Sequence, residues 1–389
     1  MKDQNVEPLF NDEFQGAPAK RSLQYILSKR EQGSPVAGLY CGYAPIEVIH
    51  AMGAYPAVLC AFAQATIEAG ESVLPGNLCP LIKSSYGFIK TDKCPFYSIS
   101  DVVIGETTCD GKKKMFELIA DIKPTHVMDL PQVPDTREAQ EGWGAMIGKV
   151  KDFLEINLNR KANDEDIHKA IIDTNEKNRM MRKIFTYAAR KPSVMTWGEV
   201  YDLTFLAMVA TGKDMKPVLE EVLQKLEQRV KDGAYSERSG APRVLVTGSP
   251  LGGDATKVFK IIEEAGGAVV AIDSCTGMKP YVTDTEENAA DPLMALSKKY
   301  LSLPCSCMTP NGRRLDELSR MIDEFSIDVV IDVVLHACHS YNVESYKVGT
   351  HVREKHHLPF LKIETDYSGS DAAQIRNRVE ALFETIVKN

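Results

Sequence analysis

The sequence predicts an α/β protein with two Rossmann-like parallel-sheet lobes that are joined by a helical region. Short apolar runs alternate with helical patterns in the first third of the chain and again in the last third. This alternation is typical of parallel sheets, because parallel strands need a crossover connection, which is usually a helix. The middle of the chain has helical spacing and no strand pattern, so it separates the two alternating parts.

The first lobe is expected to begin with a helix around residues 21–29. Pro45 suits the first position of a later helix, where its missing N–H group costs no hydrogen bond, and Gly53 suits the end of that helix. The predicted strands are 36–41, 56–60, 101–105 and 125–130, and the predicted helices are 45–52 and 110–120.

Apolar residues then recur at helical spacing from about residue 139 to residue 232, and a polar linker rich in Gly and Ser follows. The second lobe has predicted strands at 243–247, 268–273, 328–335 and 359–363 and predicted helices at 257–265 and 371–386. The expected domains are 1–138 (α/β lobe with a leading helix), 139–238 (helical bridge) and 239–389 (second α/β lobe).

The chain has 389 residues and a formal net charge of −8 at pH 7. This acidic balance gives no electrostatic reason to expect nucleic acid or an anionic membrane as a partner. No apolar run approaches the roughly 20 residues of a membrane-spanning helix. Residues 1–8 contain no apolar segment of the signal-peptide kind, so we expect a cytoplasmic protein.

Nine cysteines carry the functional signal, and four of them follow a strand-like apolar run almost at once: Cys41, Cys109, Cys275 and Cys338. Open parallel sheets bind ligands at the carboxyl ends of their strands, so thiols placed there can converge on one site. An odd number of cysteines and a reducing compartment argue against a disulfide framework. For any single cysteine, a role as a small buried apolar residue stays open.

The cysteine spacing does not match the compact metal motifs. The chain has no C-x2-C pair, which structural zinc sites and bacterial ferredoxins use. Cys305-Ser306-Cys307 and His336-Ala337-Cys338-His339 are the nearest approach to such a motif. Any cluster would therefore be held by distant segments that the fold brings together.

Cys109 stands between a predicted strand and the predicted helix 110–120, in the positive field of free N–H groups. Such a field lowers the pKa of a thiol and favours the thiolate, which is the form that binds metal. The lysines at 112–114 either offset the charge of a thiolate-bound cluster, attract an anionic substrate, or form a solvated helix face.

The turn at 248–253 lies between a predicted strand and a predicted helix, as a dinucleotide-binding turn does. Its spacing is not G-x-G-x-x-G, because residue 250 is proline, and no P-loop Lys-Ser/Thr pair follows. We interpret it as a tight βα turn, and the chain has no convincing ATP site.

Glu106, His336 and His339 are weak candidates for a general acid. Each suits a structural hydrogen bond or a supporting position beside a cluster better, so no catalytic residue is assigned.

Several segments resemble a known family. Three of them are Leu78-Cys79-Pro80 with Lys83-Ser84-Ser85-Tyr86-Gly87, Gly105-Glu106-Thr107-Thr108-Cys109-Asp110-Gly111-Lys112-Lys113, and Ala337-Cys338-His339. They resemble the D-component of the 2-hydroxyacyl-CoA dehydratases and benzoyl-CoA reductases, from about Gly38 to the C-terminus. One branch, the double-cubane cluster proteins, is similar also at Tyr40-Cys41, Cys275-Thr276-Gly277, Cys305-Ser306-Cys307 with Pro310-Asn311, and Glu364-Thr365-Asp366-Tyr367-Ser368.

The resemblance implies two sets of cluster ligands. In the dehydratases three cysteines of a subunit hold one [4Fe–4S] cluster, and the matching positions are Cys79, Cys109 and Cys338. The double-cubane branch implies a second cubane, joined to the first as an [8Fe–9S] cluster. Its expected ligands are Cys41, Cys275 and Cys307, with Cys305 a close substitute for Cys307; Cys60 and Cys94 then remain as buried or supporting thiols.

The resemblance also implies a function. The chain would be an iron–sulfur reductase, a homodimer with its double-cubane cluster in the cleft between the lobes. It would accept low-potential electrons from a separate ATP-hydrolysing [4Fe–4S] reductase and reduce a small substrate, which agrees with the absence of an ATP site. Two alternatives stay open: the [4Fe–4S] subunit of a 2-hydroxyacyl-CoA dehydratase, and a non-catalytic iron–sulfur electron carrier.

Overall fold

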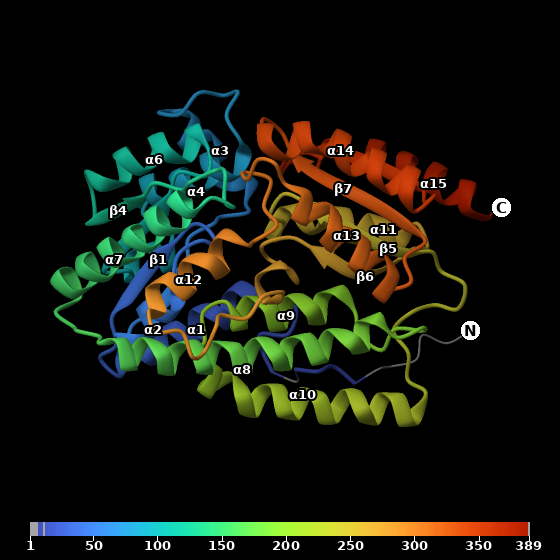
Figure 1. The fold of residues 1–389 in the computed structure, drawn as a ribbon. Helices are drawn as coiled ribbons and strands as arrows, with labels where there is room; N and C mark the ends of the chain where they lie inside the picture. Colours follow the sequence, from blue (N-terminus) through green and yellow to red (C-terminus); the bar gives the residue numbers. More distant parts are fainter. Residues whose placement is uncertain (1–6, 11, 388–389) are drawn as a thin grey trace.

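A computed structural model describes residues 7–10 and 12–387, and it contains two parallel sheets (Figure 1). The first sheet has the order β2-β1-β3-β4, and the second has the order β6-β5-β7-β8. The strands are β1 (Val36–Leu39), β2 (Tyr55–Val58), β3 (Val102–Glu106), β4 (Thr125–Met128), β5 (Arg243–Gly248), β6 (Ala268–Asp273), β7 (Val329–Leu335) and β8 (Phe360–Thr365). All six pairings are parallel. The predicted fold class is confirmed.

Both sheets reverse their strand order at the same place. The chain runs outward from β1 to β2 and then crosses to the other side at β3; β5, β6 and β7 repeat this path. In open α/β sheets such a reversal marks the crevice, at the carboxyl ends of the strands, where ligands bind. Each lobe therefore offers one such crevice.

Fifteen α-helices are present in the described residues. Those of the first lobe are α1 (Pro18–Glu31), α2 (Ile46–Ala51), α3 (Ile67–Glu71), α4 (Pro80–Lys90), α5 (Pro95–Ile99) and α6 (Asp110–Ala120). The helical bridge consists of α7 (Arg137–Leu158), α8 (Asp164–Ala189), α9 (Trp197–Ala207) and α10 (Gly212–Asp232). The remaining helices are α11 (Lys257–Glu264), α12 (Pro292–Leu301), α13 (Gly312–Glu324), α14 (His339–Lys355) and α15 (Ala372–Val387).

Local signals explain the ends of the bridge helices. Asn163 and Thr196 each form a capping box. The cap side chain accepts a hydrogen bond from the backbone N–H of the third helical residue, Asp166 or Glu199, and the carboxylate of that residue accepts one from the backbone N–H of the cap. Gly233, with φ 64°, ends α10 in the left-handed conformation that glycine adopts without strain. No strand interrupts the described chain between α7 and α10, as predicted.

One segment of the C-terminal part returns to the first lobe. Helix α12 packs along α7, and Figure 1 shows it in orange next to the blue and green elements. Leu296, Tyr300, Leu303 and Met308 share a buried core with residues of β1 and α7. The loop that carries Cys305 and Cys307 is thereby brought to the N-terminal sheet.

Three predicted strands end two residues earlier than expected. β1 ends at Leu39 and β2 ends at Val58, where their mutual pairing stops, and β4 ends at Met128. Cys41 and Cys60 consequently stand in loops just beyond the sheet.

The predicted absence of a signal peptide rests on residues 1–8, of which 1–6 lie outside the described residues. In the part of the chain that is described, no helix combines the length and apolarity needed to cross a membrane.

Candidate metal centre

The predicted ligands of the N-terminal lobe gather at the carboxyl end of its sheet. Cys41 lies two residues after β1 and Cys109 lies three residues after β3. These two strands flank the reversal of strand order, which is where the fold places ligands.

Three predicted ligands share one local setting. Cys79, Cys109 and Cys338 are the N-cap residues of α4, α6 and α14. The free N–H groups and the dipole of a helix N-terminus favour negative charge there. Cys109 Sγ accepts a hydrogen bond of 3.5 Å from the Lys112 backbone N–H. All three sulfurs therefore stand at the positive end of a helix.

Cys79 and Cys338 come from different lobes and lie close enough for each thiol to shift the pKa of the other. The hydrogen bond from Cys79 lowers the pKa of Cys338 to about 7 against the opposing effect of burial, and the Ser249 hydroxyl lowers it further. The same bond, together with burial, raises the pKa of Cys79. Ala337, with φ 56°, makes the sharp turn between β7 and α14 that presents Cys338.

Cys305 and Cys307 form a second pair, on the loop that follows α12. The hydrogen bond from Cys307 lowers the pKa of Cys305 to about 5, burial opposes it, and nearby Lys279 lowers the pKa again. The bond to Cys305 raises the pKa of Cys307, whose Sγ lies 3.5 Å from the Tyr43 hydroxyl. Cys305 is therefore the more acidic thiol of this pair.

A cavity of about 130 Å³, which we call the inner cavity, lies where these segments meet. Four thiols contribute to its wall: Cys41, Cys60, Cys275 and Cys305. Burial raises the pKa of Cys275 to about 12, and negative charge on Cys305 adds to this effect. Burial also raises the pKa of Cys41, with further contributions from Glu106, Cys275 and Cys305. These cysteines of both lobes thus lie within electrostatic reach of one another.

Four lysines line the same inner cavity: Lys112, Lys177, Lys279 and Lys299. Lys112 Nζ donates a 3.0 Å hydrogen bond to the Tyr40 carbonyl oxygen. Burial by itself would lower the pKa of Lys112, but Cys41, Cys60 and Glu106 hold it above its usual value. A cation in this position offsets the negative charge of nearby thiolates.

Lys279 has a similar role on the C-terminal side. Its Nζ lies 3.3 Å from Asp273 Oδ1, and both side chains are buried. Burial would lower its pKa, whereas Asp273, Cys275 and Cys305 raise it. Lys299 pairs with buried Glu47 at 3.4 Å, and Lys177 donates to two backbone carbonyls.

Glu106 is a buried carboxyl group beside this site. It is 0% exposed, and neither of its oxygens has a hydrogen-bond partner. Burial raises its pKa to about 8, although Lys112 opposes the shift. Glu106 is therefore protonated through most of the neutral range.

Other residues named from the sequence lie apart from this arrangement. His336 and His339 are exposed. Lys113 and Lys114 are also exposed and pair with Asp110 and Glu117, so they form a solvated helix face. Cys94 is buried at the start of α5, where its Sγ accepts a 3.3 Å hydrogen bond from the Tyr97 N–H.

Three residues of the inner cavity carry no local signal in the sequence: Lys177, Lys279 and Lys299. Cys60, which ends the predicted strand 56–60, donates a 3.2 Å hydrogen bond to the Tyr40 carbonyl, the same oxygen that Lys112 contacts. Lys177 lies in a bridge helix and Lys299 in α12. They reach the cavity through tertiary packing alone.

The residues fit an iron–sulfur cluster better than a single metal ion. Among the described residues, no three His, Cys, Asp or Glu side chains are grouped so that they could hold one ion. The thiols of a cubane bind different irons, so they need to surround the cluster and not to meet at one ion. Thiols from both lobes, helix N-termini and buried cations are the environment that such a cluster requires.

Fold and site together define a class of protein: two parallel-sheet lobes whose cysteines meet between them beside buried cations. The chain belongs to the family described as 2-hydroxyglutaryl-CoA dehydratase, D-component, whose model matches residues 41–386. The dehydratase side of the expected resemblance is thereby confirmed.

Individual relatives match over nearly their whole length. The chain is 39% identical to "Putative dehydratase subunit YjiM" of Escherichia coli (strain K12), over 97% of this chain and 98% of the relative. It is 24% identical to "(R)-phenyllactyl-CoA dehydratase beta subunit" of Clostridium sporogenes, over 98% and 100%. Identity to "Lactoyl-CoA dehydratase subunit beta" of Anaerotignum propionicum is 23%, over 92% and 93%.

Proposed function

We propose that this protein is an iron–sulfur reductase that holds a double-cubane [8Fe–9S] cluster in the cleft between its lobes. It accepts low-potential electrons from an ATP-hydrolysing [4Fe–4S] reductase and reduces a small substrate. The observation that carries the proposal is the second group of thiols. Cys41, Cys275 and Cys305 surround the inner cavity, in addition to the Cys79–Cys338 pair and Cys109.

The first cubane is assigned to Cys79, Cys109 and Cys338, and the second to Cys41, Cys275 and one cysteine of the 305–307 pair. The family resemblance favours Cys307 at this position. The geometry favours Cys305, because Cys305 lines the inner cavity, whereas Cys307 contacts Tyr43.

When bound, the cluster supplies low-potential electrons. The chain's own residues supply charge balance and shielding. Lys112 and Lys279 place positive charge beside the thiols, and Glu106 holds a proton within the buried site. Apolar side chains such as Leu39 and Leu303 make up much of the remaining wall of the inner cavity.

The ATP-dependent step is assigned to the partner because the glycine turn of this chain is already filled. A Cβ atom on Gly252 would lie 2.7 Å from the Phe62 ring, and one on Gly253 would lie 2.4 Å from the Phe62 carbonyl oxygen. Phe62 thus occupies the space in which such a turn would cradle a phosphate. We further propose a cytoplasmic homodimer.

A second candidate is the [4Fe–4S] subunit of a 2-hydroxyacyl-CoA dehydratase. The similarity to subunits named for phenyllactyl-CoA and lactoyl-CoA dehydratases favours it. That function needs a non-identical second subunit and a CoA thioester. Dehydration of a hydroxyacyl-CoA only after mixing with such a subunit would support it.

The deciding experiment is the anaerobic iron and sulfide content per chain, with EPR, for wild type and for Cys41→Ala. We expect about eight irons in wild type and about half of that in the variant, since one cubane loses a ligand. Cys94→Ala is the matched control, because Cys94 is a buried thiol outside the site, and it should keep its iron. About four irons in wild type would favour the dehydratase subunit. A protein without iron would contradict both the reductase and the dehydratase-subunit proposals.

A further inference from the structure

A second cavity, of about 570 Å³, adjoins the inner cavity, and we call it the outer cavity. Exposed residues such as Lys20 and Lys260 contribute to its wall, so it opens to solvent. Its interior is aromatic, with Phe88, Phe96, Trp197, Tyr201 and Phe205 in the wall. Neither the family match nor the named relatives assign a role to it.

The two cavities share a wall. Val58, Cys60, Phe62 and Met208 line both of them, so these side chains form the partition between the two cavities. Two of the four, Phe62 and Met208, are large enough to decide what passes.

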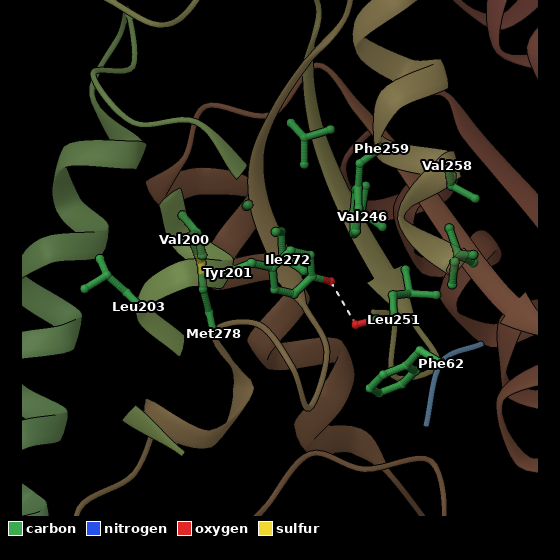
Figure 2. Packing of buried hydrophobic residues seen from close by; sticks show 14 of the residues in the cluster. Phe62, Val200, Tyr201, Leu203, Val246, Leu251, Val258, Phe259, Ile272 and Met278 are labelled. Carbon is green, nitrogen blue, oxygen red and sulfur yellow. Dashed lines mark hydrogen bonds between the residues drawn. The ribbon is translucent and has the colours of Figure 1, made fainter. Parts of the chain in front are cut away.

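Phe62 is the fixed part of the partition. Its carbonyl accepts a 2.8 Å hydrogen bond from the Asp254 N–H, and Gly252 and Gly253 approach it too closely to admit a side chain. Its ring also meets Tyr367 edge-on at 6.5 Å. Figure 2 shows Phe62 beside Leu251. The Leu251 carbonyl oxygen accepts a 3.2 Å hydrogen bond from the Tyr201 hydroxyl. The glycine turn thus holds Phe62 in place.

Met208 is the movable part. The backbone around it is fixed, because buried Lys177 donates 2.7 Å hydrogen bonds to the carbonyls of Ala207 and Ala210, on either side of it. The side chain itself is an unbranched thioether with three rotatable bonds, which adapts to irregular space. A flexible side chain on a fixed backbone can swing aside without disturbing the fold.

We propose that the outer cavity is the route by which small uncharged molecules reach the inner cavity, and that Met208 and Phe62 set the size of molecule that passes. Apolar aromatic walls admit uncharged molecules and exclude ions, which lose their hydration there. An apolar cavity of about 150 Å³ is known to bind benzene or xenon, so the outer cavity, at about 570 Å³, has room for molecules of that size. The inference rests on the proposed function in taking the inner cavity as the reaction site.

The test uses the cluster-loaded protein with methyl isocyanide and n-butyl isocyanide as probes, followed by stopped-flow absorbance and EPR. We expect the larger probe to reach the cluster roughly tenfold more slowly, since added methylenes carry discrimination of that size at an apolar constriction. Met208→Ala should remove this size dependence. Met208→Trp should slow methyl isocyanide roughly tenfold as well.

Met146→Ala and Met146→Trp are the matched controls, because Met146 is a half-buried methionine of α7 that lines neither cavity. Both should behave as wild type. Equal probe rates in wild type, Met208→Ala and Met208→Trp, at equal iron content, would overturn the route.

Xenon pressurisation of crystals provides a readout that does not need the cluster. Wild type should hold xenon in the outer cavity and against the partition, and Met208→Trp should lose only the site at the partition. An unchanged xenon pattern in Met208→Trp would also overturn the route. If the chain contains no iron, the proposed function fails, and the xenon comparison still decides the route.

Discussion

The Sγ atom of Cys307 lies 3.5 Å from the Tyr43 hydroxyl, so this contact joins the loop after α12 to the loop after β1. Its neighbour Cys305 faces the inner cavity instead. Two cysteines that are separated by one residue therefore have different surroundings: Cys307 contacts Tyr43, and Cys305 lines the inner cavity, where we propose that it is a ligand.

Substituting each cysteine of the pair separately tests this assignment. Cys305→Ala should lower the iron content from about eight to about four per chain, because one cubane loses a ligand. Cys307→Ala should retain its iron and lose only the contact to Tyr43. Anaerobic iron analysis with EPR measures both, and the opposite result would return the ligand role to Cys307.

Neutralising Lys112 should make the cluster harder to reduce. One charge several ångströms away contributes on the order of 1–2 kcal/mol at an effective dielectric constant of about 20, and this corresponds to tens of millivolts. We expect Lys112→Met to shift the midpoint potential downward by that amount in a potentiometric EPR titration. Lys114→Met, which removes an exposed lysine of the same helix, should leave the potential unchanged.

Glu106 should make stability depend on pH. Its pKa is about 8 in the folded chain against an ordinary 4.5, so the folded state binds the extra proton between these values. The stability that this proton contributes is complete below about 4.5 and is lost as the pH rises through 8. Since one pKa unit corresponds to about 1.36 kcal/mol, the total is on the order of a few kcal/mol.

Glu106→Gln should remove this dependence, so that its melting temperature relative to wild type rises from pH 5 to pH 9. The comparison is made at equal iron content. Glu117→Gln, at an exposed position on α6, is the control and should follow wild type. A parallel decline of all three proteins would show that another group titrates.

The glycine turn provides a stability test. Gly253 and Gly266 both have positive φ, at 48° and 97°. A Cβ atom added to Gly253 would lie 2.4 Å from the Phe62 carbonyl oxygen, whereas a Cβ atom added to Gly266 would have open space. Gly266→Ala should cost about 1–2 kcal/mol of unfolding free energy, from backbone strain alone. Gly253→Ala should cost clearly more, because Phe62 must shift as well. Equal losses by denaturant unfolding would contradict the close contact.

Much of the fold could be predicted from local patterns. The apolar run 268–273 coincides with β6, and the start and end of α6 match the prediction at 110–120. Helix α12 was not predicted, although Asp291 and Pro292 at its start are a recognisable signal: Asp291 Oδ1 accepts from the N–H groups of Leu293 and Met294.

The candidate site was predictable only in part. Strand ends pointed to Cys41, Cys109, Cys275 and Cys338. The residues that follow a strand can be identified from the local sequence, and in a parallel sheet these residues share one edge. The apolar stripe of α12 indicates a helix but not the lobe on which it packs. For that reason neither the approach of Lys299 nor the different surroundings of Cys305 and Cys307 could be predicted from spacing.

The closeness of Cys79 and Cys338 also has a consequence for the order in which the protein is synthesised and folds. Cys79 emerges from the ribosome early, and its partner emerges only after β7, near the end of synthesis. The α12 segment must in addition travel back to the first lobe before Cys305 reaches Cys41. A chain that is only partly synthesised therefore has neither the Cys79–Cys338 pair nor an inner cavity with all four of its thiols.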